Sequence, residues 1–179
     1  DEHRVFFIVG DVSGKGLAAS LFMALSKSLI KSIALRAQDD PASILERANA
    51  EIGRDNTESL FVTAFAGVLD ARTGRLAFCS AGHEPPIASA PGAALERVMH
   101  SGGPPLCVVQ GYAYASGQLD LPQGGWLCVV TDGVTEAMNA RFDLYGTERL
   151  LAVLRGLGSA APDAVIAAVR EDVRRFAGG

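Results

Sequence analysis

Two aspartates follow short apolar runs in this sequence, and their placement suggests metal chemistry. Asp11 comes just past the run Val5–Val9 (VFFIV), and Asp132 comes just past the apolar run that begins at Trp126. A carboxylate at the end of a strand can ligate hard divalent cations, and the adjacent carbonyl of Val12 would add another oxygen ligand. Two such strands side by side would bring both carboxylates to one sheet edge, where cations offset their repulsion. Each aspartate alone is also a common turn or cap residue, so the pair is more informative than either member.

The glycine-rich segment Gly10–Gly16 (GDVSGKG) does not fit two other motifs that carry chemistry. A P-loop needs four residues between its first glycine and its Gly-Lys pair, whereas only three separate Gly10 from Gly14. Gly16 also replaces the hydroxyl residue that would hold magnesium in a P-loop. A nucleophile elbow around Ser13 would need glycines at 11 and 15, where Asp and Lys stand. The segment therefore disfavours both a nucleotide-binding protein and a serine nucleophile.

A strand and two helices are expected around Asp11. The run Val5–Val9 is rich in β-forming residues and predicts a buried strand. Apolar residues recur at helical spacing from Leu17 to Leu35, which predicts a long amphipathic helix of the core. Two lysines and four serines make that helix too polar to cross a bilayer cheaply. Asp40 followed by Pro41 marks the start of a second helix.

Consecutive strands are expected from Leu60 onward. Residues 60–70 and 75–82 predict an antiparallel hairpin joined by the tight turn 71–74 (ARTG). Further strands separated by Pro/Gly-rich turns are expected at Pro86–Ser89, Leu95–Met99, Tyr112–Leu121 and Trp126–Val130. Helices are expected near Thr147–Leu154 and Ala161–Phe176. Strands that follow one another without intervening helices predict an α+β fold with antiparallel sheets, not a doubly wound Rossmann domain.

Composition narrows the classes of function. The chain has 179 residues, of which 49% are hydrophobic, and this fits one compact domain with a sizeable core. Its 16 basic and 20 acidic residues give a net charge of −4, which supplies no broad cationic surface for nucleic acid or a membrane. Three cysteines without CxxC spacing indicate reduced core residues and a cytoplasmic location. The chain begins Asp-Glu-His-Arg without a signal peptide, and an initial Asp suggests that an upstream segment precedes it.

Several linked motifs resemble one family in their order and spacing. They are GDVSGKGLAASLFM, FVTAFAGVLDARTGRLAFCSAGHEPP, GGPPLCV and VVTDGVTEAMN. Through them nearly the whole chain resembles the SpoIIE/RsbU-type bacterial serine/threonine phosphatases, which belong to the metal-dependent protein phosphatase 2C superfamily. The resemblance implies an α-β-β-α sandwich of two antiparallel sheets flanked by helices. It also implies two divalent cations, Mn²⁺ or Mg²⁺, and hydrolysis of a seryl or threonyl phosphate by a metal-activated water.

The resemblance also implies roles for individual residues. Asp11 matches the aspartate that bridges both metals and Val12 the residue that gives its backbone carbonyl. Asp132 matches the aspartate on one metal, so Asp11 and Asp132 form the expected catalytic pair. Lys15 stands where the family often has His or another basic residue, and it is expected either to contact the phosphate or to be a solvated loop lysine. His83, in the motif AGHEPP, is expected either to assist substrate or leaving group or to order its turn through a hydrogen bond.

Residues 1–179 are expected to form a single phosphatase domain that lacks its first strand or strands and its last strand. Family members usually carry an acidic segment before the first strand and an Asp-Asp-x-Thr strand after the last helix. Both supply metal carboxylates, so residues 1–179 alone are expected to bind metal weakly.

The resemblance implies a phosphorylated protein as substrate, in this family often an anti-sigma-factor antagonist within a partner-switching cascade. An upstream sensory or receiver domain and a homodimer are further expectations. The alternative is a catalytically weak, phosphatase-like regulatory module that binds a sigma-factor regulator or dimerises.

Overall fold

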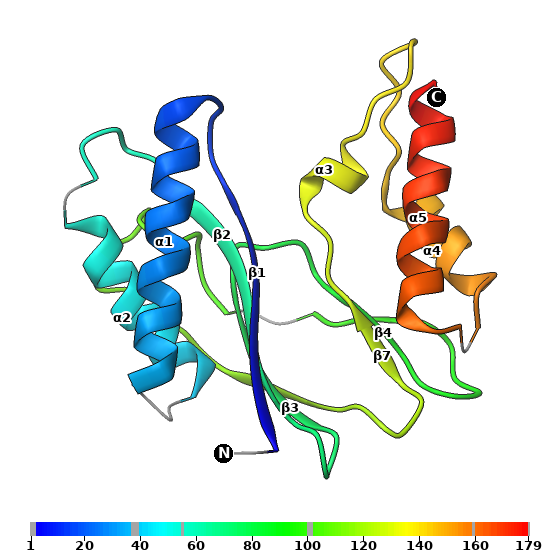
Figure 1. Ribbon diagram of the computed structural model, residues 1–179, viewed down its shortest axis with the longest axis horizontal. Helices are drawn as coiled ribbons and strands as arrows, with labels where there is room; N and C mark the ends of the chain where they lie inside the picture. The colour runs from blue at the N-terminus through cyan, green and yellow to red at the C-terminus, as the bar shows by residue number, and fades with distance from the viewer. Residues whose placement is uncertain (1–2, 37–39, 55, 100–101, 159, 179) are drawn as a thin grey trace. The chain divides into compact units, whose positions relative to one another are not determined.

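The chain divides into two compact units, each with its own sheet and helices (Figure 1). The computed structural model describes residues 3–36, 40–54, 56–99, 102–158 and 160–178. Unit 1 comprises Asp1–Pro85 and Met99–Asp120, and unit 2 comprises Pro86–Val98 and Leu121–Gly179. Each unit is described by itself below, and a single domain over residues 1–179 stays a prediction.

Unit 1 contains a four-stranded antiparallel sheet in the order β1-β2-β3-β6. The strands are β1 (Arg4–Val12), β2 (Val62–Asp70), β3 (Arg75–Ala81) and β6 (Gly117–Asp120). The predicted hairpin is confirmed as β2–β3, and its turn is held by Asp70, whose carboxylate accepts hydrogen bonds from the backbone N–H groups of Arg72 at 2.9 Å and Thr73 at 3.1 Å. These two bonds lower the pKa of Asp70, because they stabilise its charged form.

The first strand differs from its prediction in length and burial. It continues beyond Val9 to Val12, because each residue from Arg4 to Val12 pairs with one of β2. It is half-buried rather than buried, since it lies at the edge of the sheet and pairs only with β2 among the described strands.

The strand predicted for Tyr112–Leu121 is wrong over its first half. Only Gly117–Asp120 pairs in the sheet, as β6. Upstream of it, the Tyr114 backbone N–H donates to the Glu46 carboxylate at 2.9 Å, and the Ala115 N–H donates to the Gly102 carbonyl at 3.3 Å. This segment therefore satisfies backbone groups with a side chain and a loop instead of a strand ladder.

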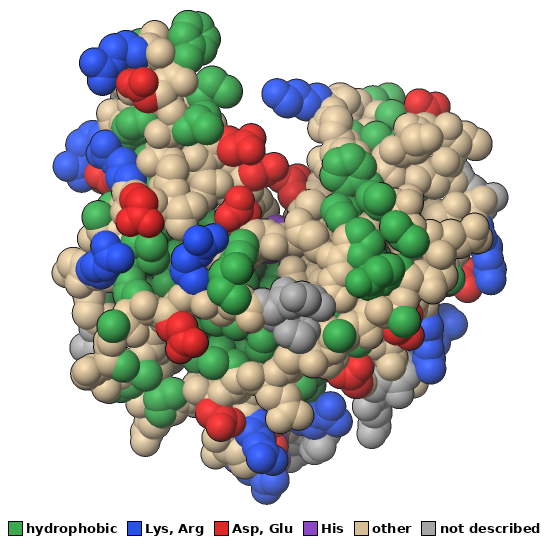
Figure 2. Space-filling view, turned by 180° about the vertical axis from the view of Figure 1, so that it is seen from behind, with side chains coloured by type: hydrophobic (Ala, Val, Ile, Leu, Met, Phe, Trp, Pro, Cys, Tyr) green, Lys and Arg blue, Asp and Glu red, His purple; other side chains and the backbone are tan. Residues whose placement is uncertain are grey.

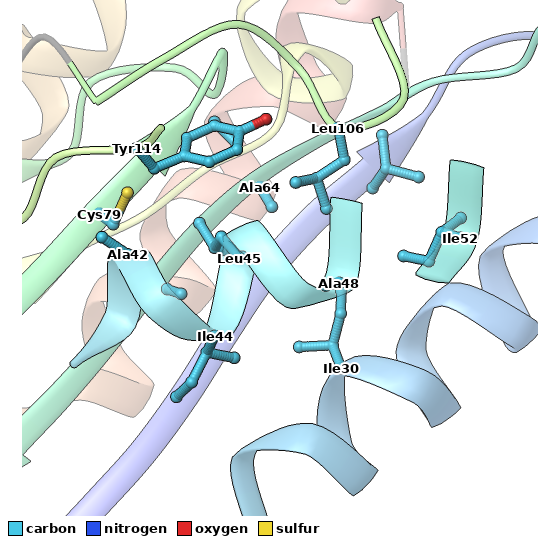
Figure 3. Packing of buried hydrophobic residues seen from close by; sticks show 13 residues of the cluster. Ile30, Ala42, Ile44, Leu45, Ala48, Ile52, Ala64, Cys79, Leu106 and Tyr114 are labelled. Atoms are coloured by element: carbon cyan, nitrogen blue, oxygen red, sulfur yellow. The ribbon is translucent and has the colours of Figure 1, made fainter. Parts of the chain in front are cut away.

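Helices α1 (Leu17–Arg36) and α2 (Pro41–Gly53) complete unit 1, as predicted. The Asp40 carboxylate caps α2 by accepting a hydrogen bond from the Ser43 N–H at 3.4 Å. α2 packs on α1, β2 and β3. Its buried residues gather in one hydrophobic cluster with residues of α1, the sheet and the loops (Figure 3), which include Ile30, Ile44, Leu45, Ala48, Ile52, Ala64, Cys79, Leu106 and Tyr114. This cluster is the core of unit 1.

The predicted amphipathic helix of the core is confirmed as a helix, but the first part of its apolar stripe is not buried. The buried residues of α1 are Ala19, Ser26 and Ile30. The large exposed residues near its start are Leu17, Leu21 and Leu25, with exposed fractions of 77%, 62% and 51%. By length and composition, α1 is the one described helix that could cross a membrane, which differs from the expectation that it is too polar. Its mean hydropathy is 1.4, and 17% of its most apolar 18-residue stretch is buried. Helices of soluble cores and signal sequences also meet this criterion.

Unit 2 contains a three-stranded antiparallel sheet and three helices. The strand order is β5-β4-β7, formed by Glu96–Arg97, Ile87–Ser89 and Trp126–Cys128. The helices are α3 (Asp132–Thr135), α4 (Thr147–Arg155) and α5 (Pro162–Ala177), and the last two confirm the helices predicted there. A second hydrophobic cluster forms the core of this unit and includes Ile87, Tyr145, Leu150, Leu154, Val165 and Val169. The predicted α+β class, with two antiparallel sheets and helices, is confirmed.

A charged tie joins α4 to α5 in unit 2. The Arg149 guanidinium donates two hydrogen bonds to the Asp172 carboxylate, at 2.8 and 3.1 Å, and the Tyr145 hydroxyl donates to it at 2.8 Å. Arg149 also lies 4.9 Å from the ring centroid of Phe176. The bonds from Arg149, and then that from Tyr145, lower the pKa of Asp172.

The three cysteines are unpaired, as the sequence indicated. Cys79 is buried, and Cys107 and Cys128 are half-buried. Burial raises the pKa of each thiol, that of Cys79 to about 12. Because thiols rather than thiolates dominate at neutral pH, these residues pack as apolar groups and are poor nucleophiles.

Candidate functional site

Asp11 lies within β1, and not beyond the strand as the sequence suggested. Strand β1 continues through it because Asp11 and Val12 still pair with Thr63 and Val62 of β2. The Asp11 side chain is half-buried, and its Oδ1 accepts a hydrogen bond from the Val12 N–H at 2.8 Å. The carboxylate is therefore fixed beside the residue whose carbonyl is the second predicted ligand.

Strands β1 and β2 approach closely around Asp11. A Cβ atom added to Gly10 would lie 2.8 Å from the Thr63 carbonyl oxygen, closer than real Cβ contacts. On the other side, the Ser13 N–H donates to the Phe61 carbonyl at 2.9 Å, and the Phe61 N–H donates to Ser13 Oγ at 2.9 Å. The backbone thus lies close against residues 61–63 of the same chain both before and after Asp11. Ser13 takes part in this contact, which agrees with its poor prospects as a nucleophile.

His83 is brought into the same region of unit 1 through Thr63. It follows β3 and is only 7% exposed. Its Nδ1 lies 3.0 Å from Thr63 Oγ1, which lies 3.5 Å from the Asp11 carbonyl oxygen. Asp11, Thr63 and His83 therefore form a row across the ends of β1, β2 and β3. Sequence reasoning missed Thr63, because only the strand register reveals that it lies opposite Asp11.

Glycines allow the loop 102–105 to pack against the turn that carries His83. Gly82 has a φ of 66°, and a Cβ there would lie 2.6 Å from the Pro105 side chain. A Cβ on Gly102 would lie 2.0 Å from the Ser80 carbonyl oxygen. Ser80 Oγ in turn donates to the His83 carbonyl at 3.4 Å. The outcome is a rigid turn beside an open cavity of about 320 Å³ lined by Ser80, Gly82, His83, Gly102, Gly103, Pro104 and Tyr112.

Lys15 lies in the turn between β1 and α1. It is exposed and stands between Gly14, with a φ of 85°, and Gly16, with a φ of 89°. Those left-handed conformations explain why glycines flank it. Its exposure suits both expectations, a phosphate contact and a solvated lysine, so each stays a prediction.

Asp132 is the first residue of the short helix α3 in unit 2. Strand β7 ends earlier, at Cys128, and Thr131 occupies the N-cap position of α3. The Asp132 side chain is exposed, and its carbonyl accepts a hydrogen bond from the Glu136 N–H at 2.7 Å. Asp132 thus follows an apolar strand as expected, but it belongs to a helix and not to the strand end. Strand β1, which carries Asp11, belongs to the sheet of unit 1, whereas β7 belongs to the sheet of unit 2. The expectation that the two aspartates follow neighbouring strands at one sheet edge is therefore wrong.

The chemical type of the donor atoms in the candidate ligands suits a hard divalent cation. Carboxylate and backbone carbonyl oxygens, as supplied by Asp11, Val12 and Asp132, are the ligands that Mg²⁺ prefers. The number of ligands is too small, because within the described parts of the chain no group of three or more His, Cys, Asp or Glu side chains is arranged to hold a metal. The donor types therefore fit a divalent cation, but the ligand set is incomplete.

Charges of both signs share the surface seen in Figure 2. Lys and Arg side chains are interspersed with Asp and Glu side chains on this face. The mixed pattern follows the composition, in which 16 basic residues accompany 20 acidic ones. Hydrophobic side chains also gather on one side of this face, so it is not uniformly polar.

The sequence profile of the family described as Stage II sporulation protein E (SpoIIE) matches residues 1–179. The chain belongs to this family. Protein IcfG of Synechocystis is 26% identical over 174 residues, which cover 82% of this chain and 27% of that protein. The phosphoserine phosphatase RsbU of Bacillus subtilis is 26% identical over 136 residues, which cover 76% of this chain and 40% of that protein. The chain thus spans less than half the length of these relatives.

Solved structures share the fold. The RsbU and RsbW domains of Rv1364c from Mycobacterium tuberculosis superpose with a TM-score of 0.85 and 25% identity, over 98% of this chain and 49% of that one. The structure of the PP2C phosphatase domain of SpoIIE from Bacillus subtilis, with a fragment of its regulatory domain, superposes with a TM-score of 0.81 and 17% identity. The match covers 98% of this chain and 51% of that one. The expected protein phosphatase 2C-like fold is therefore confirmed. Two neighbours in fold contain metal: RsbX with magnesium, at a TM-score of 0.69, and PstP with two manganese ions, at 0.67.

Proposed function

We propose that this chain carries the catalytic part of a metal-dependent protein serine/threonine phosphatase. The observation that carries the proposal is the fixed position of Asp11 and Val12 at the end of β1, in a chain of the SpoIIE family. A relative named as a phosphoserine phosphatase supports the activity.

Asp11, the Val12 carbonyl and Asp132 are the proposed metal ligands, and Asp11 and Asp132 the proposed catalytic residues. Two divalent cations, Mn²⁺ or Mg²⁺, would supply charge neutralisation at the phosphoryl group and an activated water. The protein's part is to present ligands with little freedom, as the Val12 N–H does for the Asp11 carboxylate. Lys15 is proposed to attract the phosphate through its exposed ammonium group. For His83, which is buried and lies against the Thr63 hydroxyl, ordering of its turn is proposed over contact with substrate.

The proposed substrate is a phosphorylated protein, specifically an anti-sigma-factor antagonist in a partner-switching cascade in the cytoplasm. The named activity of RsbU and the neighbour in which RsbU and RsbW domains share a chain support this choice. An upstream sensory or receiver domain belongs to the same proposal, since the relatives are more than twice as long as the matched region. A homodimer is also proposed.

A regulatory module without turnover is the second candidate. It is favoured by one observation: the described residues include no group of three or more side chains arranged to hold a metal. Such a module would bind a sigma-factor regulator or dimerise through the same fold.

The experiment that separates the two candidates measures phosphate release by the full-length protein from an aryl phosphate and a phosphoserine peptide, with and without Mn²⁺. Asp11→Asn and Asp132→Asn are each expected to lower Mn²⁺-dependent turnover at least about 100-fold, because each removes a charged metal ligand. Asp163→Asn, at an exposed position in the first turn of α5, is the matched control and should leave turnover unchanged. A wild-type protein without Mn²⁺-dependent turnover would favour the regulatory module.

A further inference from the structure

Thr63 and His83 form a pair that the proposed chemistry does not yet use. Thr63 lies directly opposite Asp11 in the β1–β2 register, and its hydroxyl lies between the Asp11 carbonyl and the His83 ring. The contact with His83, at 3.0 Å, is the shorter of the two. The hydroxyl therefore links the edge strand that carries Asp11 to the turn after β3.

The turn that carries His83 is built to hold its ring in place. Gly82 forms an isolated bridge with Ala64, next to Thr63, and its left-handed conformation lets Pro105 pack against it. The His83 side chain is also buried, at 7% exposure, so few rotamers remain open to it. The imidazole is thus a fixed partner for the Thr63 hydroxyl.

The Thr63 hydroxyl lies between two groups, the Asp11 carbonyl and His83 Nδ1, and can donate its proton to only one of them at a time. A hydroxyl has one proton to donate and can also accept. When it donates to the Asp11 carbonyl, the His83 Nδ1–H donates to Oγ1. When it donates to Nδ1 instead, it has no proton left for the Asp11 carbonyl. The link from His83 through Thr63 to Asp11 therefore forms in the arrangement in which Nδ1 carries a proton.

We propose that Thr63 and His83 are positioning residues, which hold the end of β1 so that the Asp11 carboxylate and the Val12 carbonyl keep one orientation. His83 then acts through Thr63 and not by contact with the phosphate. This inference rests on the proposed function, because the expected effect is on metal affinity. The restraint on the end of β1 itself requires no metal.

The first test measures amide hydrogen exchange of residues 11–13 in the metal-free, full-length protein. Thr63→Val keeps the shape of the side chain but removes the hydroxyl, and it is expected to speed exchange of these amides roughly tenfold, because a local restraint is lost. Thr63→Ser keeps the hydroxyl and should exchange like the wild type. Thr57→Val, at an exposed loop position, is the matched control.

The second test measures Mn²⁺ affinity by calorimetry together with the melting temperature. Thr63→Val and His83→Leu are each expected to raise the Kd for Mn²⁺ roughly tenfold, as is usual when an outer partner of a ligand is lost. His83→Asn, whose amide nitrogen replaces Nδ1, should recover most of the affinity. Melting temperatures close to the wild type would separate positioning from a general loss of stability.

The outcomes distinguish this inference from the proposed function. A wild-type protein that binds neither Mn²⁺ nor Mg²⁺ would overturn the phosphatase proposal, while the exchange measurement would still decide the role of the pair. Unchanged amide exchange together with unchanged Mn²⁺ affinity in Thr63→Val would overturn the positioning role of Thr63 and His83. A raised KM for aryl phosphate in both His83→Asn and His83→Leu, with unchanged Mn²⁺ affinity, would assign His83 to the phosphate and also overturn the inference.

Discussion

The surroundings of Asp11 and Asp132 differ in how firmly they hold a carboxylate. Asp11 is half-buried in the edge strand β1, the residues before and after it pair with β2, and its Oδ1 accepts a hydrogen bond from the Val12 N–H. Asp132 is exposed at the start of a four-residue helix. The comparison teaches that similar strand-then-aspartate sequences yield one carboxylate held in place by its own strand and one that is exposed in a short helix.

Lengthening each aspartate by one methylene gives the largest expected contrast. Asp11→Glu should lower kcat/KM for an aryl phosphate about 100-fold, because the fixed backbone leaves no room to compensate for a ligand displaced by about 1 Å. Asp132→Glu should lower kcat/KM only about tenfold, since the exposed segment around Asp132 can adjust to the longer side chain. Steady-state kinetics at saturating Mn²⁺ measure both variants. Equal losses would remove the distinction between the two surroundings.

The glycine beside each aspartate offers the next contrast. Gly10→Ala would place its Cβ 2.8 Å from the Thr63 carbonyl oxygen and is expected to lower the free energy of unfolding by about 1–3 kcal/mol. Gly133→Ala meets only Thr131 Oγ1, at 3.4 Å, in a helical position where alanine is favoured by up to about 1 kcal/mol. Urea denaturation followed by circular dichroism would measure both. A stabilising Gly10→Ala would contradict the close approach of β1 and β2.

Breaking the tie between Arg149 of α4 and Asp172 of α5 is expected to have the smallest effect. This change tests whether the segment around Asp11 is independent of unit 2. Arg149→Ala should lower the melting temperature only slightly and speed hydrogen exchange in residues 147–177, because an ion pair with an exposed arginine contributes little to stability. Exchange of residues 11–13 should not change. Faster exchange there would show that the two regions are coupled.

Acidification tests the same tie through Asp172. Because its pKa is lowered in the folded protein, the tie stabilises the fold fully above the ordinary value of 3.8 and loses this contribution as the pH falls through the lower, folded pKa. The difference in melting temperature between wild type and Asp172→Asn is therefore expected at pH 7 and should shrink below pH 3.8. A difference that persists in acid would mean that charge is not what holds the helices together.

Local patterns predicted most of the fold. The apolar run before Gly10, the Asp40-Pro41 helix start and the turn after Asp70 are each decided by residues within a few positions, and the structure confirms all three. The exposed face of α1 could not be predicted, because helical spacing identifies an apolar stripe but not what covers it.

The candidate site was predictable only in part. Asp11 and Asp132 were found through motifs, but Thr63 gained its role from the register of two strands about 50 residues apart in sequence. The segment before Gly117 was misjudged because its backbone partners are a distant carboxylate, that of Glu46, and the carbonyl of Gly102. Such long-range partners leave no periodic signal in the sequence.

The contact between loop 102–105 and turn 80–83 also constrains how this protein can change over evolutionary time. Because a Cβ on Gly102 would meet the Ser80 carbonyl and one on Gly82 would meet Pro105, neither segment can accept a larger residue while the other keeps its path. Substitutions in the two segments should therefore be accepted jointly or not at all. Insertions that diversify a surface elsewhere would here displace the turn that carries His83.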